Sequence, residues 1–258
     1  MLRKIRLIAA TLCFVLITLL FLDFTGTLHG WFGWLAKIQF LPAVLALNVG
    51  VVLFLVLLTL AFGRVYCSVI CPLGVFQDVI ARIGRRGKKL PYSYSPALSW
   101  LRYGVLFVFV LALVAGVGSL VALLAPYSAY GRIANNLFQP LWMWGNNLFA
   151  YLAARVESYA FYEVDVWMKS LPTFLVALAT LVVLVVLAWR NGRTYCNTIC
   201  PVGTVLGVIS RYSLYRVTID TDKCNSCGLC ARQCKAACIN SKEHKIDGSL
   251  YELPGYLS

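Results

Sequence analysis

Four long apolar runs dominate this sequence and constrain its fold more than any other feature. They cover residues 5–22, 42–62, 102–124 and 171–189, and charged side chains are almost absent inside them. A helix of about 20 apolar residues is long enough to cross the hydrocarbon core of a bilayer. The chain is 60% hydrophobic and only 13% charged, which is more apolar than an ordinary soluble domain. We therefore predict an α-helical integral membrane protein with four transmembrane helices.

The distribution of the 23 lysine and arginine residues predicts the orientation of these spans. Nineteen of them lie on one side, at the N-terminal tip, between the second and third runs, and after the fourth run. Basic residues concentrate on the cytoplasmic side, so we predict a multi-pass protein of the cytoplasmic (inner) membrane with both termini in the cytoplasm. This topology and contact with anionic membrane lipid account for the net charge of +13, and we expect no nucleic-acid partner.

A twelve-residue motif occurs twice, once after the second apolar run and once after the fourth. Residues 63–74 read Gly-Arg-Val-Tyr-Cys-Ser-Val-Ile-Cys-Pro-Leu-Gly, and residues 192–203 match them at eight of twelve positions. Each copy directly follows the predicted cytoplasmic end of a span. We therefore predict that the membrane domain, residues 1–215, consists of two parallel two-helix repeats, each with one cysteine motif.

Each copy of the motif contains a C-x₃-C-P element, formed by Cys67 and Cys71 or by Cys196 and Cys200. Residues four apart share one face of a helix, so the two thiols of a pair are expected to point together. The following proline favours the first turn of a helix, where the helix dipole favours thiolate. If the repeats pack about a pseudo-twofold axis, the four thiolates converge. We interpret them as a second metal or cluster site; redox-active dithiols and a purely structural packing role are the alternatives.

Arg64 and Arg193 occupy the same position in the two motifs, three residues before the first cysteine. Each is a cofactor-binding candidate, because a guanidinium there can neutralise an anionic cluster or bind a lipid phosphate. The alternative is that these long side chains snorkel to the membrane interface.

The densest cysteine cluster follows the second repeat and has the spacing C-x₂-C-x₂-C-x₃-C, which is that of bacterial ferredoxins. A zinc site would instead have two C-x-x-C pairs separated by a longer segment. We predict that residues 216–258 form a small ferredoxin-like α+β region, which a 4Fe–4S cluster stabilises because so short a segment lacks its own core. The predicted ligands are Cys224, Cys227, Cys230 and Cys234.

The fourth ligand of this cluster is open. In two-cluster ferredoxins the last cysteine of the run binds the other cluster, and a proline follows it. Here Lys235 follows Cys234, and no second four-cysteine run is present in the sequence. The fourth ligand is therefore Cys234, Cys238 or a residue of a partner chain.

Four spans, two C-x₃-C-P motifs at inner span ends and a C-terminal ferredoxin run together resemble the NapH/MauN-type membrane-bound 4Fe–4S ferredoxins. Their relatives include the CcoG-like and NosR-type polyferredoxins. The resemblance covers nearly the whole chain and is most specific in the twin Gly-Arg-x-Tyr-Cys-x₃-Cys-Pro-x-Gly motifs. It implies electron transfer between the quinone pool and a partner iron–sulfur or cytochrome subunit. Such proteins usually contain two four-cysteine runs, so this chain is expected to be a shortened or C-terminally truncated member.

The leading hypothesis is a membrane-bound iron–sulfur electron-transfer protein, the membrane subunit of a quinol dehydrogenase. A quinol would supply two electrons, and a 4Fe–4S site would pass them singly to the partner. Two alternatives use the same cysteines: a metalloenzyme assembly factor of the CcoG kind, which gives electrons to a metal ion, and a non-enzymatic membrane redox sensor. The sequence assigns no catalytic residue.

Overall fold

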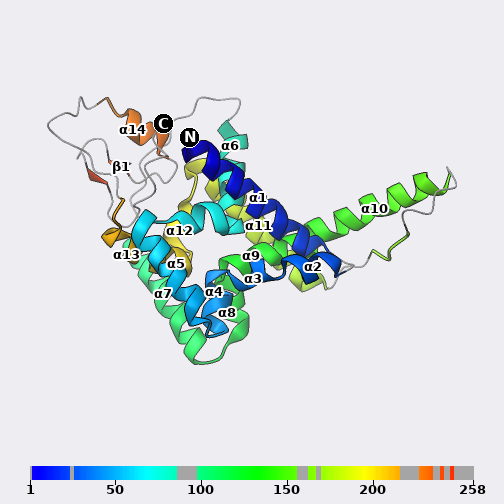
Figure 1. Cartoon of the computed structure of the whole chain (residues 1–258), viewed down its shortest axis with the longest axis horizontal. Coiled ribbons are helices and arrows are strands. Elements are labelled where there is room, and N and C mark those ends of the chain that lie inside the picture. The colour runs from blue at the N-terminus through cyan, green and yellow to red at the C-terminus, as the bar shows by residue number, and fades with distance from the viewer. Residues whose placement is uncertain are drawn as a thin grey trace.

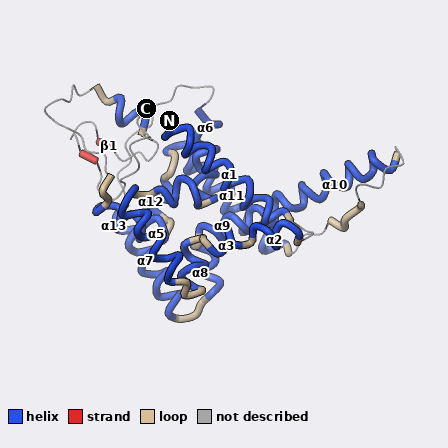
Figure 2. The backbone as a smooth tube through the Cα atoms, in the orientation of Figure 1, coloured by secondary structure: helices blue, strands red, loops and turns tan. Residues whose placement is uncertain are grey.

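The described part of the chain is almost entirely helical. Figure 2 shows this composition, with strand only near the C-terminal end. There β1 (Ile239–Asn240) pairs antiparallel with β2 (Lys245–Ile246). The computed structural model describes residues 2–23, 26–85, 98–155, 162–166, 170–215, 227–234, 239–240 and 245–246.

Two of the described helices are long and apolar enough to cross a membrane, α1 (Leu2–Leu22) and α11 (Leu171–Asn191). Their most apolar segments have mean hydropathies of 2.6 and 2.7, and only 17% of each is buried inside the protein. A core helix of a soluble protein would be mostly buried, so this exposed apolar surface indicates that lipid covers it. The two helices therefore support a membrane protein.

The apolar runs predicted as the second and third spans are each divided into two helices by a turn. Leu47 and Gly116 have positive φ in these turns, at 51° and 72°. A residue in this conformation ends a helix. The prediction of four spans is not confirmed, because the longer helix of each pair has only 14 or 16 residues. The four helices are α4 (Phe40–Leu45), α5 (Val49–Phe62), α7 (Ser99–Val114) and α8 (Gly118–Leu124).

The two repeats interlock through the helices that follow their cysteine motifs. α6 (Pro72–Arg85) follows the first motif and packs against α1 and against α11 of the second repeat. α13 (Pro201–Ile209) follows the second motif and packs against α7 and against α5 of the first repeat. Figure 1 shows α5, α7 and α13 together at one side of the helical body. Each of these helices thus contacts the second apolar helix of the opposite repeat.

The segment between α8 and α11 also contains helices. α9 (Pro126–Ile133) continues into the π-helix η2 (Ala134–Phe138) and then into α10 (Gln139–Ala154). α9 packs against α6 and α11, so it belongs to the helical body. α10 projects away from that body (Figure 1).

After α13 the chain returns to the end of α5. Leu214 N donates a hydrogen bond to the carbonyl oxygen of Leu60 at 2.8 Å, which satisfies a carbonyl group near the end of the helix. The ring of Tyr215 stacks on that of Phe62, with centroids 5.7 Å apart. The C-terminal region therefore starts beside the first motif. The remaining helices are α2 (Thr27–Phe32), α3 (Trp34–Lys37), the π-helix η1 (Tyr66–Ile70), α12 (Thr194–Thr198), the 3₁₀-helix η3 (Ser210–Tyr212) and α14 (Leu229–Gln233).

Candidate functional site

The first glycine of each motif ends the apolar helix before it. Gly63 follows α5 and Gly192 follows α11, with φ of 72° and 75°. Residues with a Cβ atom rarely adopt such a conformation, whereas glycine adopts it at little cost. Glycine at this position therefore lets the chain leave the helix abruptly and enter the cysteine loop.

The two cysteines of each motif lie in different local structures. Cys67 lies in η1 and Cys196 lies in α12, each a helix of five residues. Cys71 and Cys200 are extended, and each is followed by the proline that begins α6 or α13. The prediction that proline starts the next helix is confirmed. The prediction that both thiols share one helical face is wrong, because the helix ends before the second cysteine.

The last glycine of each motif allows the new helix to start against the cysteine loop. A Cβ atom on Gly74 would overlap the carbonyl oxygen of Cys67, and one on Gly203 would overlap that of Cys196. A backbone oxygen cannot move aside alone, so no larger residue fits without shifting the loop. The spacing C-x₃-C-P-x-G therefore describes a close packing of helix on loop that fixes the cysteine pair.

The four cysteines of the two motifs converge in one buried core. Each of them is at most 6% exposed. Every pair among the four is close enough for one thiol to affect the protonation of the other. None of the cysteines that the structure describes forms a disulfide. The converging residues are Cys67, Cys71, Cys196 and Cys200.

Burial controls the protonation of these thiols. Desolvation, followed by repulsion from Cys67, raises the pKa of Cys200 to about 12. The N–H of Gly203 and the guanidinium of Arg64 oppose this rise, but they are weaker than the burial. The start of the helix therefore favours thiolate in the direction predicted from the sequence, but less strongly than burial disfavours it. Four thiolates in this core require positively charged metal atoms among them.

Hydrogen-bond donors reach the sulfur atoms of this core. Gly203 N donates to Cys200 Sγ at 3.3 Å, and Gln77 Nε2 donates to Cys196 Sγ at 3.3 Å. Gln77 is fully buried, so its amide depends on partners inside the protein. Hydrogen bonds to sulfur are one means by which proteins set the potential of an iron–sulfur cluster. These donors therefore fit a cluster held by the four cysteines.

The thiols of the described residues are not grouped as the ligands of a single metal ion would be. In the described ranges, no three His, Cys, Asp or Glu side chains are close enough together to hold one metal ion. A group that contains several metal atoms places its thiolate ligands further apart than one ion does. The role of the four cysteines as ligands of such a group stays a prediction.

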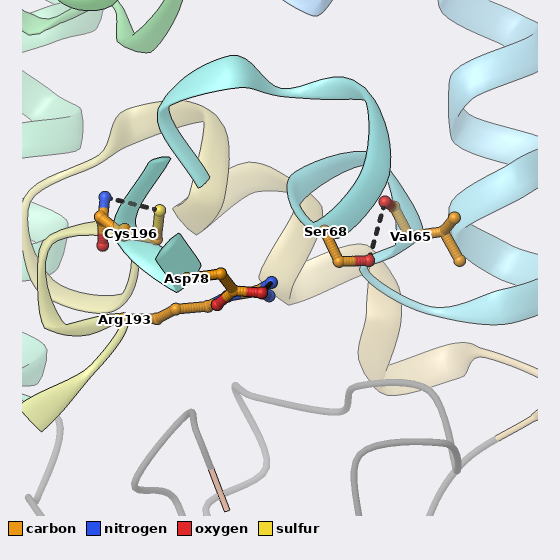
Figure 3. Close-up of polar contacts among 6 residues, drawn as sticks. Val65, Ser68, Asp78, Arg193 and Cys196 are labelled. Carbon is orange, nitrogen blue, oxygen red and sulfur yellow. Dashed lines mark hydrogen bonds and ion pairs between the residues drawn. The ribbon is translucent and has the colours of Figure 1, made fainter. Parts of the chain in front are cut away.

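The two motif arginines are buried, and each crosses to the opposite repeat. Arg64 is 3% exposed and Arg193 is 1% exposed. Arg193 Nε and Nη2 donate to the two carboxylate oxygens of Asp78 at 2.8 and 2.7 Å; Figure 3 shows these side chains facing each other. Arg64 donates to Asn197 Oδ1 at 3.1 Å and to the carbonyl oxygen of Gly203. The alternative that these arginines snorkel to the interface is therefore wrong.

Each arginine also stands near one of the thiols. Burial raises the pKa of Cys196, and the Arg193 guanidinium opposes that rise, as Arg64 does at Cys200. A cluster bound by four thiolates is anionic, so a nearby buried cation stabilises it. The positions of both arginines suit the predicted role as neutralising charges.

The C-terminal cysteine run is described only in part. α14 begins after Gly228, whose φ of 69° lets the loop turn tightly. Cys224 and Cys238 lie outside the described residues, so the fourth ligand stays open. Of the three cysteines of this run that the structure describes, Cys227 is exposed, Cys230 is partly buried and Cys234 is buried.

Sequence reasoning missed two residues of this site, Gln77 and Asp78. Both lie on α6, just after the first motif. One signal was available, because aligning the repeats places Gly207 opposite Asp78. An acidic residue at a position where the other repeat has glycine indicates that the acid has a basic partner in the fold.

A family model described as "4Fe-4S binding domain" matches residues 44–91 and 173–218. These two segments contain the twin motifs and all four converging cysteines. The matched segments end before the C-terminal run. The match therefore associates the membrane repeats themselves with iron–sulfur binding.

The chain is also similar to several known proteins over most of its length. It is 30% identical to the ferredoxin-type protein NapH of Haemophilus influenzae, over 83% of this chain and 62% of that protein. It is 26% identical to the methylamine utilization ferredoxin-type protein MauN of Paracoccus denitrificans, over 83% and 63%. It is 24% identical to the putative electron transport protein YccM of Escherichia coli, over 75% and 47%. The chain thus spans about half to two thirds of the length of these relatives, and no solved structure matches it.

Proposed function

Because this chain belongs to the NapH/MauN-type ferredoxin family, we propose that it passes electrons from the quinone pool to a partner redox protein. One observation carries this proposal: the cysteines of both repeats converge in a single buried core. The iron–sulfur family match on the same two segments supports a 4Fe–4S cluster in that core. Oxidation of a quinol releases two electrons, which go to the partner through the iron–sulfur sites, and two protons, which go to water.

The proposed arrangement in the membrane follows from the apolar helices. α1, α11 and the two divided runs would lie in the cytoplasmic membrane with both termini on the cytoplasmic side. The exposed apolar surfaces of α1 and α11 support this arrangement. The excess of basic residues beside the cysteine motifs supports the orientation.

The residues around the four thiolates would bind and tune the cluster. A bound 4Fe–4S cluster accepts and donates one electron at a time. Gly203 N and Gln77 would hydrogen-bond to the ligand sulfurs and favour the reduced state, since a hydrogen bond stabilises added negative charge. Arg64 and Arg193 would act in the same direction through their charge.

Two tyrosines help to exclude water from the same core. Tyr66 is 1% exposed and donates its hydroxyl hydrogen to Gln39 Oε1 at 2.9 Å, while accepting a bond from Phe40 N at 3.0 Å. Tyr130 is fully buried and lies in the same cluster of side chains. Burial of this kind keeps the dielectric constant low around the thiolates and sets the potential further.

The C-terminal run would hold a second cluster nearer to the partner. The exposed position of Cys227 supports this role, since a docking protein needs an accessible cluster. The ligands would be Cys224, Cys227 and Cys230, together with either Cys234 or Cys238.

Addition of a reduced quinone to the purified, oxidised full-length protein under anaerobic conditions tests the proposal. We expect the EPR signal of a reduced 4Fe–4S cluster in the wild type and in Cys13→Ser, which changes a thiol on α1 outside the motifs. Combined Cys67→Ser and Cys196→Ser substitutions should abolish reduction by the quinol. Wild-type protein that contains iron and sulfide but is reduced by no quinol would contradict the proposal.

A further inference from the structure

A cavity of about 420 Å³ lies among α1, α8, α9, η2 and the start of α11. Its volume is in the range of small-molecule binding sites. A smaller cavity of about 300 Å³, beside α4, α7 and α8, is lined almost entirely by Leu, Ala, Val and Gly. The larger cavity differs because aromatic, amide, hydroxyl and guanidinium groups meet in it. The lining residues that matter here are Phe21, Tyr127, Arg132, Asn135, Asn136 and Thr173.

Arg132 is fixed in the cavity wall by the end of α8. Its Nη1 and Nη2 donate to the carbonyl oxygens of Ala122 and Leu123 at 2.6 and 3.0 Å. These carbonyl groups belong to the last turn of a helix, which an arginine can cap. The Nε–H of Arg132 is buried and has no hydrogen-bond partner within the described ranges. A buried donor in this state is unfavourable, and a ligand oxygen that accepts its hydrogen bond would remove that penalty.

The amide side chains of η2 extend the polar part of the wall. Asn136 Nδ2 donates to the carbonyl oxygen of Arg132 at 2.9 Å, and the Thr173 hydroxyl is shared between the carbonyl oxygen of Ser170 at 2.9 Å and Asn136 Oδ1 at 3.3 Å. Asn135, the neighbouring residue, also lines the cavity. η2 is a π-helix, a form that is frequent at functional sites. The polar wall is thus a connected network that joins η2 to α11.

Another part of the wall is aromatic, and one of its rings belongs to α1. The rings of Phe21 and Tyr127 lie 5.2 Å apart between centroids, and a flat ring packs well on such a surface. No Asp, Glu or His is among the described lining residues, so the site favours a ligand with electron-rich oxygens over a cation. α1 and α11, which both contribute to the wall, are the helices with exposed apolar surfaces. A ligand with an apolar tail can therefore enter from the bilayer.

Packed side chains connect this cavity with the cysteine core. The ring of Phe21 lies 6.1 Å from that of Tyr130, and Tyr130 belongs to the buried cluster that contains Cys67, Cys71 and Cys200. Arg132 is close enough to Tyr195 to affect its protonation, and Tyr195 directly precedes Cys196. A ligand in the cavity is therefore a near neighbour of the proposed cluster ligands.

We propose that this cavity binds the head group of a quinone, and we call it the quinone cavity. This inference rests on the proposed function and gives its electron donor a place. Arg132 Nε–H and the Asn135 amide would donate hydrogen bonds to the quinone oxygens, and Phe21 and Tyr127 would hold the ring. Oxidation of the bound quinol would give the quinone, two protons that leave to water, and two electrons that the proposed iron–sulfur sites accept one at a time.

Equilibrium binding of a short-tailed benzoquinone to the full-length protein in lipid nanodiscs tests the site without measuring electron transfer. Asn135→Phe fills the cavity and should weaken binding by more than about tenfold. Thr173→Val removes one hydroxyl and should weaken it about threefold. Thr180→Val is the matched control, because this threonine also lies on α11 but bonds to Val176 O at 2.7 Å and does not line the cavity. It should bind as the wild type does.

The outcomes separate this site from the proposed function. Wild-type affinity in both Asn135→Phe and Thr173→Val would overturn the quinone cavity, while quinol reduction of the same variants would leave the proposed function standing. Displacement of the quinone by anionic phospholipid, with no competition by other quinones, would assign Arg132 to a lipid phosphate and also overturn the site. Normal quinone binding without any reduction of the iron–sulfur sites would instead contradict the proposed function. An unchanged unfolding midpoint shows that each variant is folded.

Discussion

The two repeats share one motif but hold its arginine in different ways. Arg193 of the second repeat reaches α6 of the first and pairs with the carboxylate of Asp78. Arg64 of the first repeat reaches α13 of the second, where Gly207 occupies the position equivalent to Asp78. It bonds to the neutral oxygens of Asn197 on α12 and Gly203 on α13. In both repeats the arginine thus crosses to the opposite repeat, but only Arg193 has a charged partner there.

Because Gly207 has no side chain, arginine side chains can approach the backbone of α13 at this position. A Cβ atom on Gly207 would overlap a terminal nitrogen of Arg64 and one of Arg102, so both guanidinium groups lie against its Cα. Arg102 lies on α7, and its Nη2 donates to the carbonyl oxygen of Thr204 at 3.3 Å. Where the first repeat places one carboxylate, the second therefore brings two guanidinium groups together.

The largest expected effect on stability comes from removing the carboxylate charge of Asp78. Asp78→Asn keeps the shape of the side chain but leaves the buried Arg193 without its carboxylate. Loss of one partner of a buried ion pair is strongly destabilising, and with Asp78 19% exposed we expect a loss of about 2–3 kcal/mol in the free energy of unfolding. Asn197→Leu, which removes a neutral partner of Arg64, should cost only about 1 kcal/mol. Equal losses in chemical unfolding of the two variants would contradict the comparison.

The motif glycines should behave alike in the two repeats. Gly74→Ala and Gly203→Ala each force a Cβ atom against a carbonyl oxygen of the cysteine loop, and each should cost about 1–3 kcal/mol. Gly104→Ala is the control, because a Cβ atom there meets nothing within 4 Å and alanine favours the helix by about 1 kcal/mol. Thermal unfolding measures all three. A large difference between Gly74→Ala and Gly203→Ala would show that the two loops are not packed equivalently.

Placing an acidic residue at position 207, which is equivalent to Asp78, should distinguish the effect of side-chain charge from that of side-chain size. Gly207→Asp and Gly207→Asn add side chains of nearly equal volume, and both must displace the ends of Arg64 and Arg102. The carboxylate can bond to the displaced guanidinium groups, so we expect Gly207→Asp to be more stable than Gly207→Asn by about 1 kcal/mol. The reverse order in unfolding experiments would contradict an electropositive site at Gly207.

The smallest effect concerns the motif tyrosines. Tyr66→Phe breaks the hydrogen bonds with Gln39 and Phe40 and should cost about 1 kcal/mol. Tyr195 occupies the same motif position, and its hydroxyl makes no hydrogen bond to another residue of the described segments. Tyr195→Phe should therefore change stability by less than about 0.5 kcal/mol. Similar losses for the two variants, measured by unfolding in the same detergent, would show that Tyr195 has a partner of its own.

Local features of the site could be predicted from the sequence. The twin motif, the prolines that begin α6 and α13, and the apolar helices before the motifs all depend on residues close together in the chain. Glycine and proline restrict the backbone by themselves, so their positions indicate where a helix ends or begins. The resemblance that these motifs carry was confirmed by the similarity to NapH and MauN.

Features that depend on distant residues could not be predicted in the same way. Arg193 and Asp78 are 115 positions apart, so the burial of the arginine could not be distinguished from snorkelling without its partner. The turn at Leu47 has no local signal either, because leucine rarely adopts positive φ. The quinone cavity combines residues from five helices, none of which stands out in its own segment.

The central claim is that the four cysteines of the membrane repeats hold an iron–sulfur cluster. Its most direct test is the iron and sulfide content of the anaerobically purified full-length protein in which Cys227, Cys230 and Cys234 are replaced by serine. We expect about four iron and four sulfide atoms per chain to remain, since one 4Fe–4S cluster would still be bound. Further replacement of Cys67 and Cys196 should remove them. A protein that is folded but free of iron before that last step would contradict the claim.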